Sequence, residues 1–200
     1  MIFLSLKLNR IPKITEFVSY TTHLKISHKS SPKLLKEFLL KLEKQTKHNF
    51  NPFGRITNSN ITLIVKKELE SKDKIKFFSY YDDELIAYSY LTKFEKYSKK
   101  HNCILGIVIS DNWQGHGFGK EICNYMIKYA WNRKYTKIWL TVFADNSLAI
   151  NMYKSLGFDV EGIFMNDELS LDKNRHVVSM AIFKNKKNYS KRRKKIWDNI

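Results

Sequence analysis

Three glycines within five positions have the clearest chemical meaning in this chain. They stand in the run Gln114-Gly115-His116-Gly117-Phe118-Gly119. Glycine has no Cβ, so backbone N–H groups at such a site can approach an anion closely and surround it. An apolar, mostly β-branched run at 104–109 precedes the glycines and predicts a buried strand, and apolar residues at helical spacing follow them. The glycines therefore lie where a strand turns into a helix, which predicts a phosphate-binding loop built from backbone groups.

The glycine spacing excludes two common nucleotide motifs. The Walker pattern G-x-x-x-x-G-K-[ST] fails, because Gln114 stands at its first glycine and Glu121 at its serine or threonine. The dinucleotide pattern G-x-G-x-x-G also fails, because neither of its two possible frames ends on a glycine. What remains is Gln114-x-x-Gly117-x-Gly119, which resembles the Q/R-x-x-G-x-G/A loop of the GNAT acetyltransferases. In that family the loop holds the pyrophosphate of acetyl-CoA; a tight turn without a ligand is the alternative.

A second motif about thirty residues later supports the same resemblance. The segment 146–158 has Asn146, an alanine three residues later, then Tyr153, and then Leu-Gly-Phe, and it resembles the second GNAT signature. Between the two motifs, residues 137–142 predict the intervening strand. Order, spacing and residue identity agree with the family from Leu105 to Gly162, whereas the N-terminal half fits only loosely.

The resemblance implies an α/β fold with a mixed, mostly antiparallel central sheet, a splayed pair of parallel strands and flanking helices. It also implies that acetyl-CoA lies in the wedge between the strands at 104–109 and 137–142. There, unpaired backbone groups can bind the pantetheine amides as another strand would. The implied cofactor-binding residues are Ile107, Val108, Ile109, Gln114, Gly115, His116, Gly117, Phe118, Gly119, Lys120, Asn146 and Tyr153.

Several of these residues have a plainer alternative. The side chains at 107–109 can serve as core residues while their backbone groups bind the cofactor and polarise the thioester carbonyl. His116 and Lys120 can be solvated side chains, because these positions vary freely in the motif. Asn146 can be a helix N-cap and nothing more.

The resemblance implies a catalytic role for Tyr153. Its hydroxyl would donate a proton to the coenzyme A thiolate as it leaves, and the alternative is a core tyrosine on the apolar face of its helix. Many relatives carry a carboxylate on the strand before the glycine loop, but residues 104–109 contain none. Nothing in the sequence orients Asp145 or His101 as a base, so we name no general base.

The leading hypothesis is an N-acetyltransferase in which a primary amine attacks acetyl-CoA directly. The acceptor is open among a protein or peptide amine, an amino sugar, an amino acid and an antibiotic, and a longer acyl donor ranks below acetyl. A polyamine suits the chain less, because a net charge of +17 does not steer a polycation unless the pocket is locally acidic. The segments 50–54 and 161–175 are expected to border the acceptor pocket. The alternative function is a non-catalytic GNAT-fold module that docks on nucleic acid or the ribosome through a basic tail.

Length and composition predict one domain, since 200 residues with 43% hydrophobic side chains can bury a core. We expect the domain at 21–184, a possible N-terminal extension at 1–20 and the basic tail at 185–200. Cys103 and Cys123 lack metal-ligand spacing, so we expect no metal and interpret both as small core residues in a reducing compartment. No window reaches about 18 uncharged apolar residues, which predicts a soluble, cytoplasmic protein without membrane association.

The remaining elements must position the two motifs. In the N-terminal half the expected elements are a strand at 23–27, a helix from Ser31-Pro32 to about Thr46, a loop at 48–54, a helix from Asn58 or Asn60 to about Glu70, and a hairpin of strands at 75–81 and 85–94. After the second motif we expect a short strand, a loop at 161–175 and a last strand at 176–183. This order is that of an α/β fold with a mixed sheet, and it matches the GNAT order.

Overall fold

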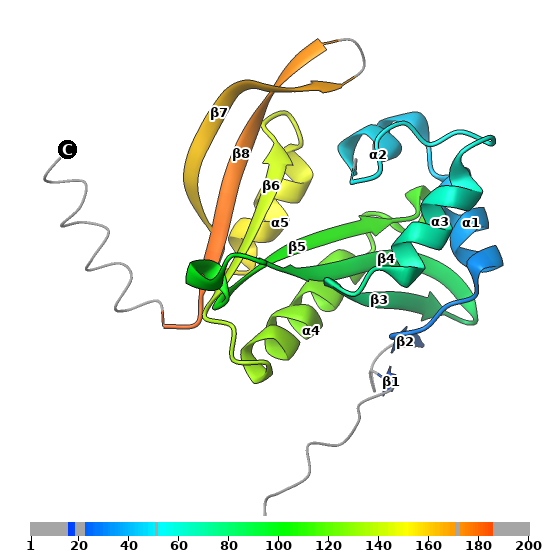
Figure 1. Ribbon diagram of the computed structural model, residues 1–200, viewed down its shortest axis with the longest axis horizontal. Helices are drawn as coiled ribbons and strands as arrows, with labels where there is room; N and C mark the ends of the chain where they lie inside the picture. The colour runs from blue at the N-terminus through cyan, green and yellow to red at the C-terminus, as the bar shows by residue number, and fades with distance from the viewer. Residues whose placement is uncertain (1–15, 19–22, 51, 171–172, 186–200) are drawn as a thin grey trace, which may run out of the picture.

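A mixed β-sheet forms the centre of the molecule (Figure 1). A computed structural model describes residues 16–18, 23–50, 52–170 and 173–185. Their elements are β1 (Glu16–Val18), β2 (Leu24–Ser27), α1 (Pro32–Lys41), α2 (Lys44–Asn49), α3 (Ile61–Glu70), β3 (Lys74–Tyr81), β4 (Glu84–Lys93), β5 (Asn102–Ile109), α4 (Phe118–Asn132), β6 (Lys137–Phe143), α5 (Ser147–Ser155), β7 (Asp159–Ser170) and β8 (Lys173–Phe183). The strand order is β1-β2-β3-β4-β5-β6-β8-β7. Only β5 and β6 pair in parallel among these strands, which confirms the predicted sheet.

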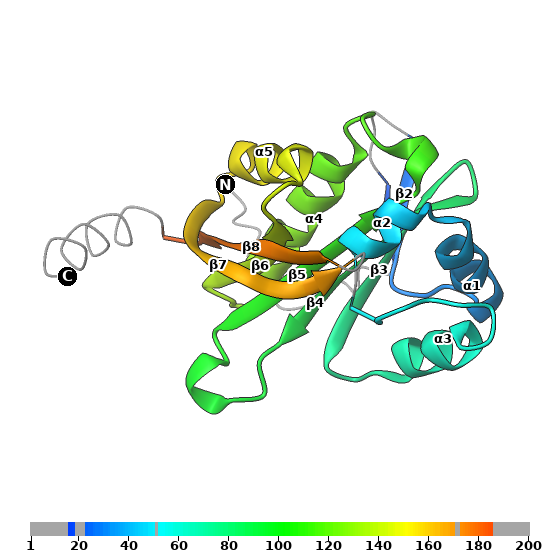
Figure 2. The same ribbon diagram turned by 90° about the horizontal axis from the view of Figure 1, so that it is seen from above.

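The sheet separates two hydrophobic cores (Figure 2). Helices α4 and α5 cover one face, and α1 and α3 cover the other. Side chains of a strand alternate between the faces, so Cys103 and Leu105 of β5 join the core under α4 and α5, whereas Val108 joins the core under α1 and α3. The two faces of β5 therefore face different surroundings.

The hairpin and the second helix of the N-terminal half lie where the sequence predicts them. Strands β3 and β4 pair antiparallel through a turn at Asp82 and Asp83, both of which have positive φ. Helix α3 ends at Glu70 as expected. Ser31 caps α1 by accepting a hydrogen bond from the backbone N–H of Leu34 at 3.1 Å.

The single helix predicted at 31–46 is wrong, because the chain breaks into α1 and α2. Leu42 is extended and 3% exposed, so its side chain enters the core. Glu43 then donates its backbone N–H to Asp111 at 2.8 Å, and the Thr46 hydroxyl donates to the same carboxylate. Asp111 is far away in the sequence, so local periodicity could not indicate this break. The expected loop at 48–54 also starts late, since α2 continues to Asn49.

The loop predicted at 161–175 is also wrong, because β7 and β8 form a long hairpin there. The segment contains Gly162, Asn166 and several acidic residues, a composition typical of loops. Strand β7 tolerates them because it is an edge strand with register shifts after Val160 and after Phe164. Asn166 has a φ of 52° and donates its backbone N–H to Nδ1 of His176 at 3.0 Å.

The two ends of the chain are described only in part. Within the expected extension at 1–20, residues 16–18 form β1 and pair with β2. The expected tail at 185–200 lies outside the described residues except for its first position. Across the described ranges, no helix is both long and apolar enough to cross a lipid bilayer.

A buried carboxylate joins α3 to the sheet. Glu68 is 5% exposed, accepts a hydrogen bond from the Tyr88 hydroxyl and lies 2.7 Å from the Lys74 ammonium. Burial and the charge of Glu68 raise the pKa of Tyr88, so its phenol stays protonated and donates.

Replacing Tyr88 by phenylalanine should lower the free energy of unfolding by about 1–3 kcal/mol, because Glu68 loses a buried donor. Chemical denaturation measures this loss. The control Tyr97→Phe changes a ring that is 78% exposed and should leave stability unaltered. Equal stabilities of the Tyr88 variant and the wild type would contradict the assignment.

Candidate functional site

Strands β5 and β6 start side by side and then separate (Figure 1). They pair only from Asn102 with Lys137 to Ile104 with Trp139. Beyond that point β5 continues to Ile109 along β4, and β6 continues to Phe143 along β8. The inner edges of both strands are therefore without a strand partner in the described part of the chain, which confirms the predicted splay. We call the space between these two edges the wedge.

The glycine loop lies at the open end of the wedge. Gly115 has a φ of 80°, and Gly117 has a φ of 86° and is the N-cap of α4. Gly119 meets a different need, because a Cβ there would lie 2.9 Å from Sδ of Met152 and 3.1 Å from Cδ1 of Ile109. The first N–H groups of a helix have no partner within it and carry partial positive charge. The loop thus has the geometry of an anion site.

Gln114 holds the loop in shape. Its side-chain Nε2 donates to the carbonyl of Ile109 at 3.1 Å and to Oγ1 of Thr46 at 3.2 Å. These bonds tie the loop to the end of β5 and to α2. His116 Nδ1 lies 2.9 Å from the carbonyl of Gln114, and Lys120 is exposed.

Four of the predicted cofactor residues have apolar side chains, and these side chains pack in the hydrophobic cores. Val108 is 4% exposed and Phe118 is 8% exposed, and Ile107 and Ile109 pack against the core under α4 and α5. Phe118 contacts the ring of Trp113 edge-on at 5.6 Å. Backbone groups, rather than side chains, are what these four positions can offer a ligand.

Asn146 and Tyr153 belong to α5, at its N-cap and on its buried side. Asn146 is the N-cap, since its Oδ1 accepts a hydrogen bond from the backbone N–H of Ala149 at 3.2 Å. Tyr153 is 7% exposed and packs against Phe158 with ring centroids 5.6 Å apart. Burial raises the pKa of Tyr153, and Cys123 and Tyr90 raise it further. Its hydroxyl makes no hydrogen bond to any described residue, so this protonated phenol keeps an unused donor.

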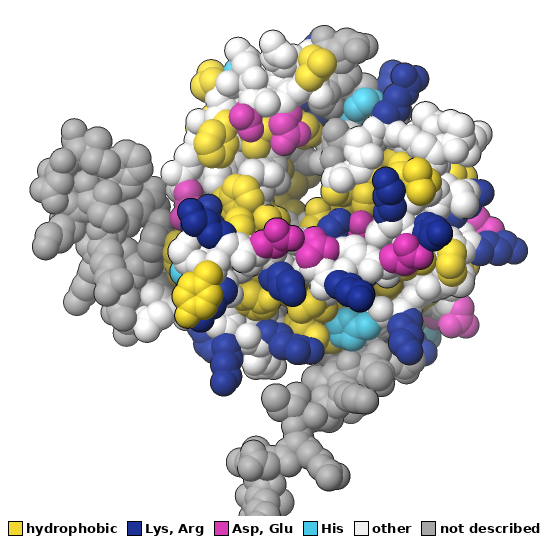
Figure 3. Space-filling model, viewed as in Figure 1, with side chains coloured by type: hydrophobic (Ala, Val, Ile, Leu, Met, Phe, Trp, Pro, Cys, Tyr) yellow, Lys and Arg dark blue, Asp and Glu magenta, His cyan; other side chains and the backbone are white. Residues whose placement is uncertain are grey.

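An open cleft of about 340 Å³ lies beside the wedge, between α2 and the β7–β8 hairpin. The same face of the molecule is hollowed between these two parts (Figure 3). The cleft is lined by Gln45, Ala144, Asp145, Lys173, Asn174, Arg175 and His176. Its hairpin side includes part of the segment 161–175, one of the two segments expected at the acceptor pocket, whereas its opposite side is α2 and not 50–54.

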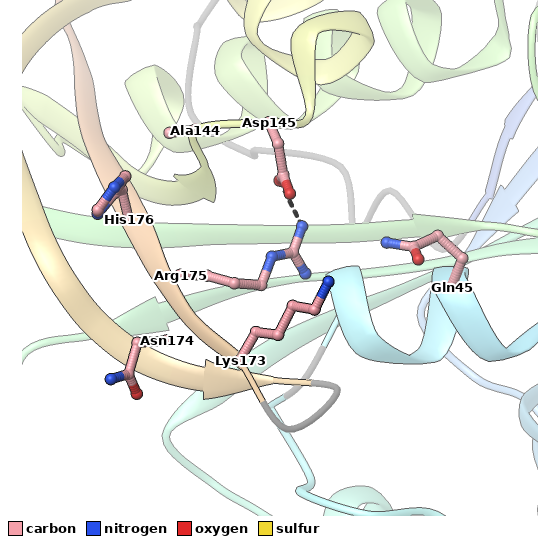
Figure 4. Close-up of a pocket in the computed structure, with 7 residues that line it drawn as sticks. All are labelled: Gln45, Ala144, Asp145, Lys173, Asn174, Arg175 and His176. Atoms are coloured by element: carbon pink, nitrogen blue, oxygen red, sulfur yellow. Dashed lines mark hydrogen bonds and ion pairs between the residues drawn. The ribbon is translucent and has the colours of Figure 1, made fainter.

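Arg175 connects the walls of this cleft (Figure 4). Its guanidinium donates to Oδ1 of Asn49 at 3.2 and 3.3 Å and forms an ion pair with Asp145. It also stacks over the Phe143 ring at 3.6 Å. One side chain thus joins β8, α2 and the segment between β6 and α5.

Sequence reasoning missed Arg175, Asn49 and the link from Asp111 to α2. None of the three belongs to a motif, and each acts through a partner at least 30 residues away. The one sequence signal for this network was weak: Asp145, the partner of Arg175, directly precedes Asn146, the N-cap of α5.

Other reactive groups have structural roles. Both cysteines are buried, as predicted, and burial raises the pKa of Cys103 and of Cys123 to about 12, so neither thiol is a ready nucleophile. Within the described ranges, no group of three or more His, Cys, Asp or Glu side chains is placed so that it could hold a metal ion. His101 precedes β5 at the end of the strand where β5 and β6 are paired, away from the open wedge.

Comparison with known proteins agrees with this geometry. The model of the acetyltransferase (GNAT) family matches residues 42–158, which include the wedge, the glycine loop and Tyr153. The L-amino acid N-acetyltransferase of Escherichia coli is 29% identical over 82 residues, or 40% of this chain and 51% of that protein. The chain thus spans about half the length of the curated relatives it matches.

Two solved acetyltransferases share the fold. Spermidine N-acetyltransferase from Vibrio cholerae, in complex with CoA and spermine, has a TM-score of 0.69 at 19% identity over 80% of this chain and 95% of its own. Ribosomal-protein-S18-alanine N-acetyltransferase from Escherichia coli has a TM-score of 0.61 at 19% identity over 80% of this chain and 93% of its own. At such identities the likeness shows the fold alone.

Proposed function

Because the chain belongs to the acetyltransferase (GNAT) family, we propose that it transfers the acetyl group of acetyl-CoA to a primary amine. The observation that carries this proposal is the wedge, which opens onto the glycine-rich start of α4. The wedge supplies unpaired backbone groups for the pantetheine arm, and the helix start supplies N–H groups for the pyrophosphate. A solved protein of similar fold is in complex with CoA, which supports CoA as a ligand of this chain.

Each residue has a defined part in this proposal. Backbone groups of residues 107–109 bind the pantetheine, and one N–H polarises the thioester carbonyl and stabilises the charge that develops on its oxygen. Backbone groups of residues 115–120 bind the pyrophosphate, with Gln114 holding their loop in shape. Asn146 is the N-cap of α5 and is proposed to contact the cofactor as well.

The transfer itself needs one bond formed and one broken. The amine nitrogen bonds to the thioester carbon, the bond from carbon to sulfur breaks, and the electron pair leaves on sulfur. Tyr153 then donates its phenolic proton to that sulfur. The attacking nitrogen loses its excess proton to water, because the carboxylates Asp111 and Asp145 are already bound to α2 and to Arg175, and a proton from water then restores the Tyr153 phenol.

The cleft favours some acceptors over others. Its lining includes the cations Lys173 and Arg175 and one carboxylate, Asp145, which is paired with Arg175. Such a lining repels a polycation and suits an amine of lower positive charge, such as an amino acid, an amino sugar or a peptide amine. The relatives act on an L-amino acid, on spermidine and on a ribosomal protein, so they leave the acceptor open.

Calorimetry with acetyl-CoA and with acetylpantetheine tests the proposal. Acetylpantetheine lacks the pyrophosphate, so it should bind far more weakly than acetyl-CoA. Release of coenzyme A with a panel of an amino acid, an amino sugar, a peptide and spermidine then identifies the acceptor. A folded protein without affinity for acetyl-CoA would refute the enzyme assignment.

The alternative function, docking on nucleic acid or the ribosome, depends on the basic tail outside the described residues, and no described feature favours it. The proposal includes a cytoplasmic location, which the reduced and buried Cys103 and Cys123 support.

A further inference from the structure

Tyr90 of β4 crosses over β5 at the point where the wedge begins. It is the register partner of Gly106. A Cβ on Gly106 would lie 2.3 Å from Cζ of the Tyr90 ring and 2.6 Å from its hydroxyl oxygen. Gly106 has an ordinary negative φ, so this close approach, and not a turn, requires the glycine.

Gly106 lies near the apex of the wedge. The pairing of β5 with β6 ends at Ile104. Gly106 stands two residues further along β5, so it is the first position after the paired part that lies on the same face of the sheet as Ile104. The hydroxyl of Tyr90, which lies over Gly106, is thus close to the point where the two strands part.

The Tyr90 side chain lies on the same face of the sheet as Phe143, the ring that Arg175 of the cleft covers. Tyr90 packs in the core under α1 and α3, together with Val108. Arg175 of the cleft stacks over the Phe143 ring. On β6, Leu140 and Val142 point into the core under α4 and α5, so Phe143 points to the other face, the one on which Tyr90 lies. Tyr153 belongs to the core under α4 and α5. Two tyrosines therefore approach the wedge from opposite faces.

The ring of Tyr90 is held in place, whereas its hydroxyl is not. The Lys74 ammonium lies 4.6 Å from the ring centroid, and Phe50 packs against the ring with centroids 6.1 Å apart. The hydroxyl makes no hydrogen bond to any residue of the described ranges. Burial, with a smaller effect of Glu68, raises the pKa of Tyr90 to about 12, so the phenol stays neutral at pH 7.

We propose that the Tyr90 hydroxyl is a second catalytic group, which accepts a hydrogen bond from the attacking amine and directs its lone pair at the thioester carbon. The role rests on the proposed function. A neutral phenol has a free oxygen lone pair for an N–H donor, and it takes no proton from the amine. Orientation of a reactant in this way contributes to the rate without any covalent step.

Replacing Tyr90 by phenylalanine removes one oxygen and keeps the ring over Gly106. Because no described partner is lost, the melting temperature and the affinity for acetyl-CoA should be unchanged. The acceptor should react with a kcat/KM lower by roughly tenfold or more, since a hydrogen bond to the reacting amine is gone. Steady-state kinetics with the amine found in the panel measures this loss.

Tyr88→Phe is the matched control on the same strand. Its hydroxyl points to Glu68, so that variant should be less stable yet retain the wild-type kcat/KM. Gly106→Ala should reproduce the kinetic defect, because the new Cβ displaces the Tyr90 ring.

The outcomes separate the two proposals. If Tyr90→Phe reacts as fast as the wild type, the role of Tyr90 is refuted while the enzyme assignment remains. If the wild type binds no acetyl-CoA, the enzyme assignment itself is refuted. If Gly106→Ala does not fold, the Tyr90→Phe result alone decides.

Discussion

Tyr153→Phe is expected to lower the turnover number by roughly 10²- to 10⁴-fold, the usual contribution of a positioned general acid. The substitution removes only the hydroxyl, so the ring keeps its packing against Phe158. The affinity for acetyl-CoA should change little, because the proposed cofactor contacts are mainly backbone groups of the wedge and the glycine loop.

The protonation state of Tyr153 supports this expectation. Burial raises its pKa, and the neighbouring Cys123 and Tyr90 act in the same direction. A phenol with a raised pKa keeps its proton at neutral pH and can give it to a thiolate that is leaving. Turnover should therefore not depend on ionisation of Tyr153 near neutrality.

Coenzyme A release and acetyl-CoA calorimetry on the same preparations measure both effects. Tyr135→Phe is the matched control, because Tyr135 packs against the same core but lies two residues before β6, at the end where β5 and β6 are paired. That control should keep wild-type turnover. Turnover of the Tyr153 variant within a factor of about three of the wild type would remove the hydroxyl from the mechanism.

The site was predictable where it depends on neighbours in the sequence. The loop from Gln114 to Gly119 follows from backbone needs that only glycine meets, and the structure has it after β5, running into the first turn of α4. The N-cap role of Asn146 and the positions of α4, β6 and α5 follow from local patterns in the same way.

Features that depend on distant partners were not predictable. The break before α2 exists because Asp111 binds Glu43 and Thr46 across more than 60 residues. The hairpin of β7 and β8 looked like a loop, because an edge strand can be polar and bulged. The sequence did not show why position 106 is a glycine, because the requirement comes from the ring of Tyr90 on the neighbouring strand β4.

Gly117→Glu is expected to weaken acetyl-CoA binding by roughly a hundredfold or more, because a carboxylate would occupy the place proposed for the pyrophosphate. Gly117 is the N-cap of α4, and no atom lies within 4 Å of a Cβ built on it, so the new side chain can reach solvent in front of the helix. A negative charge at a helix start stabilises the helix, which offsets the strain of a positive φ. The variant should therefore fold.

Gly54→Glu separates occlusion from strain. Gly54 also has a positive φ, of 68°, and a Cβ there also meets no atom within 4 Å, but it lies outside the glycine loop and does not line the cleft. The Gly54→Glu variant should bind acetyl-CoA with the affinity of the wild type. Gly117→Asn adds no charge and suits a left-handed backbone, so its affinity should lie between the two. Equal affinities of Gly117→Glu and Gly54→Glu, both folded by circular dichroism, would show that the start of α4 does not bind the pyrophosphate.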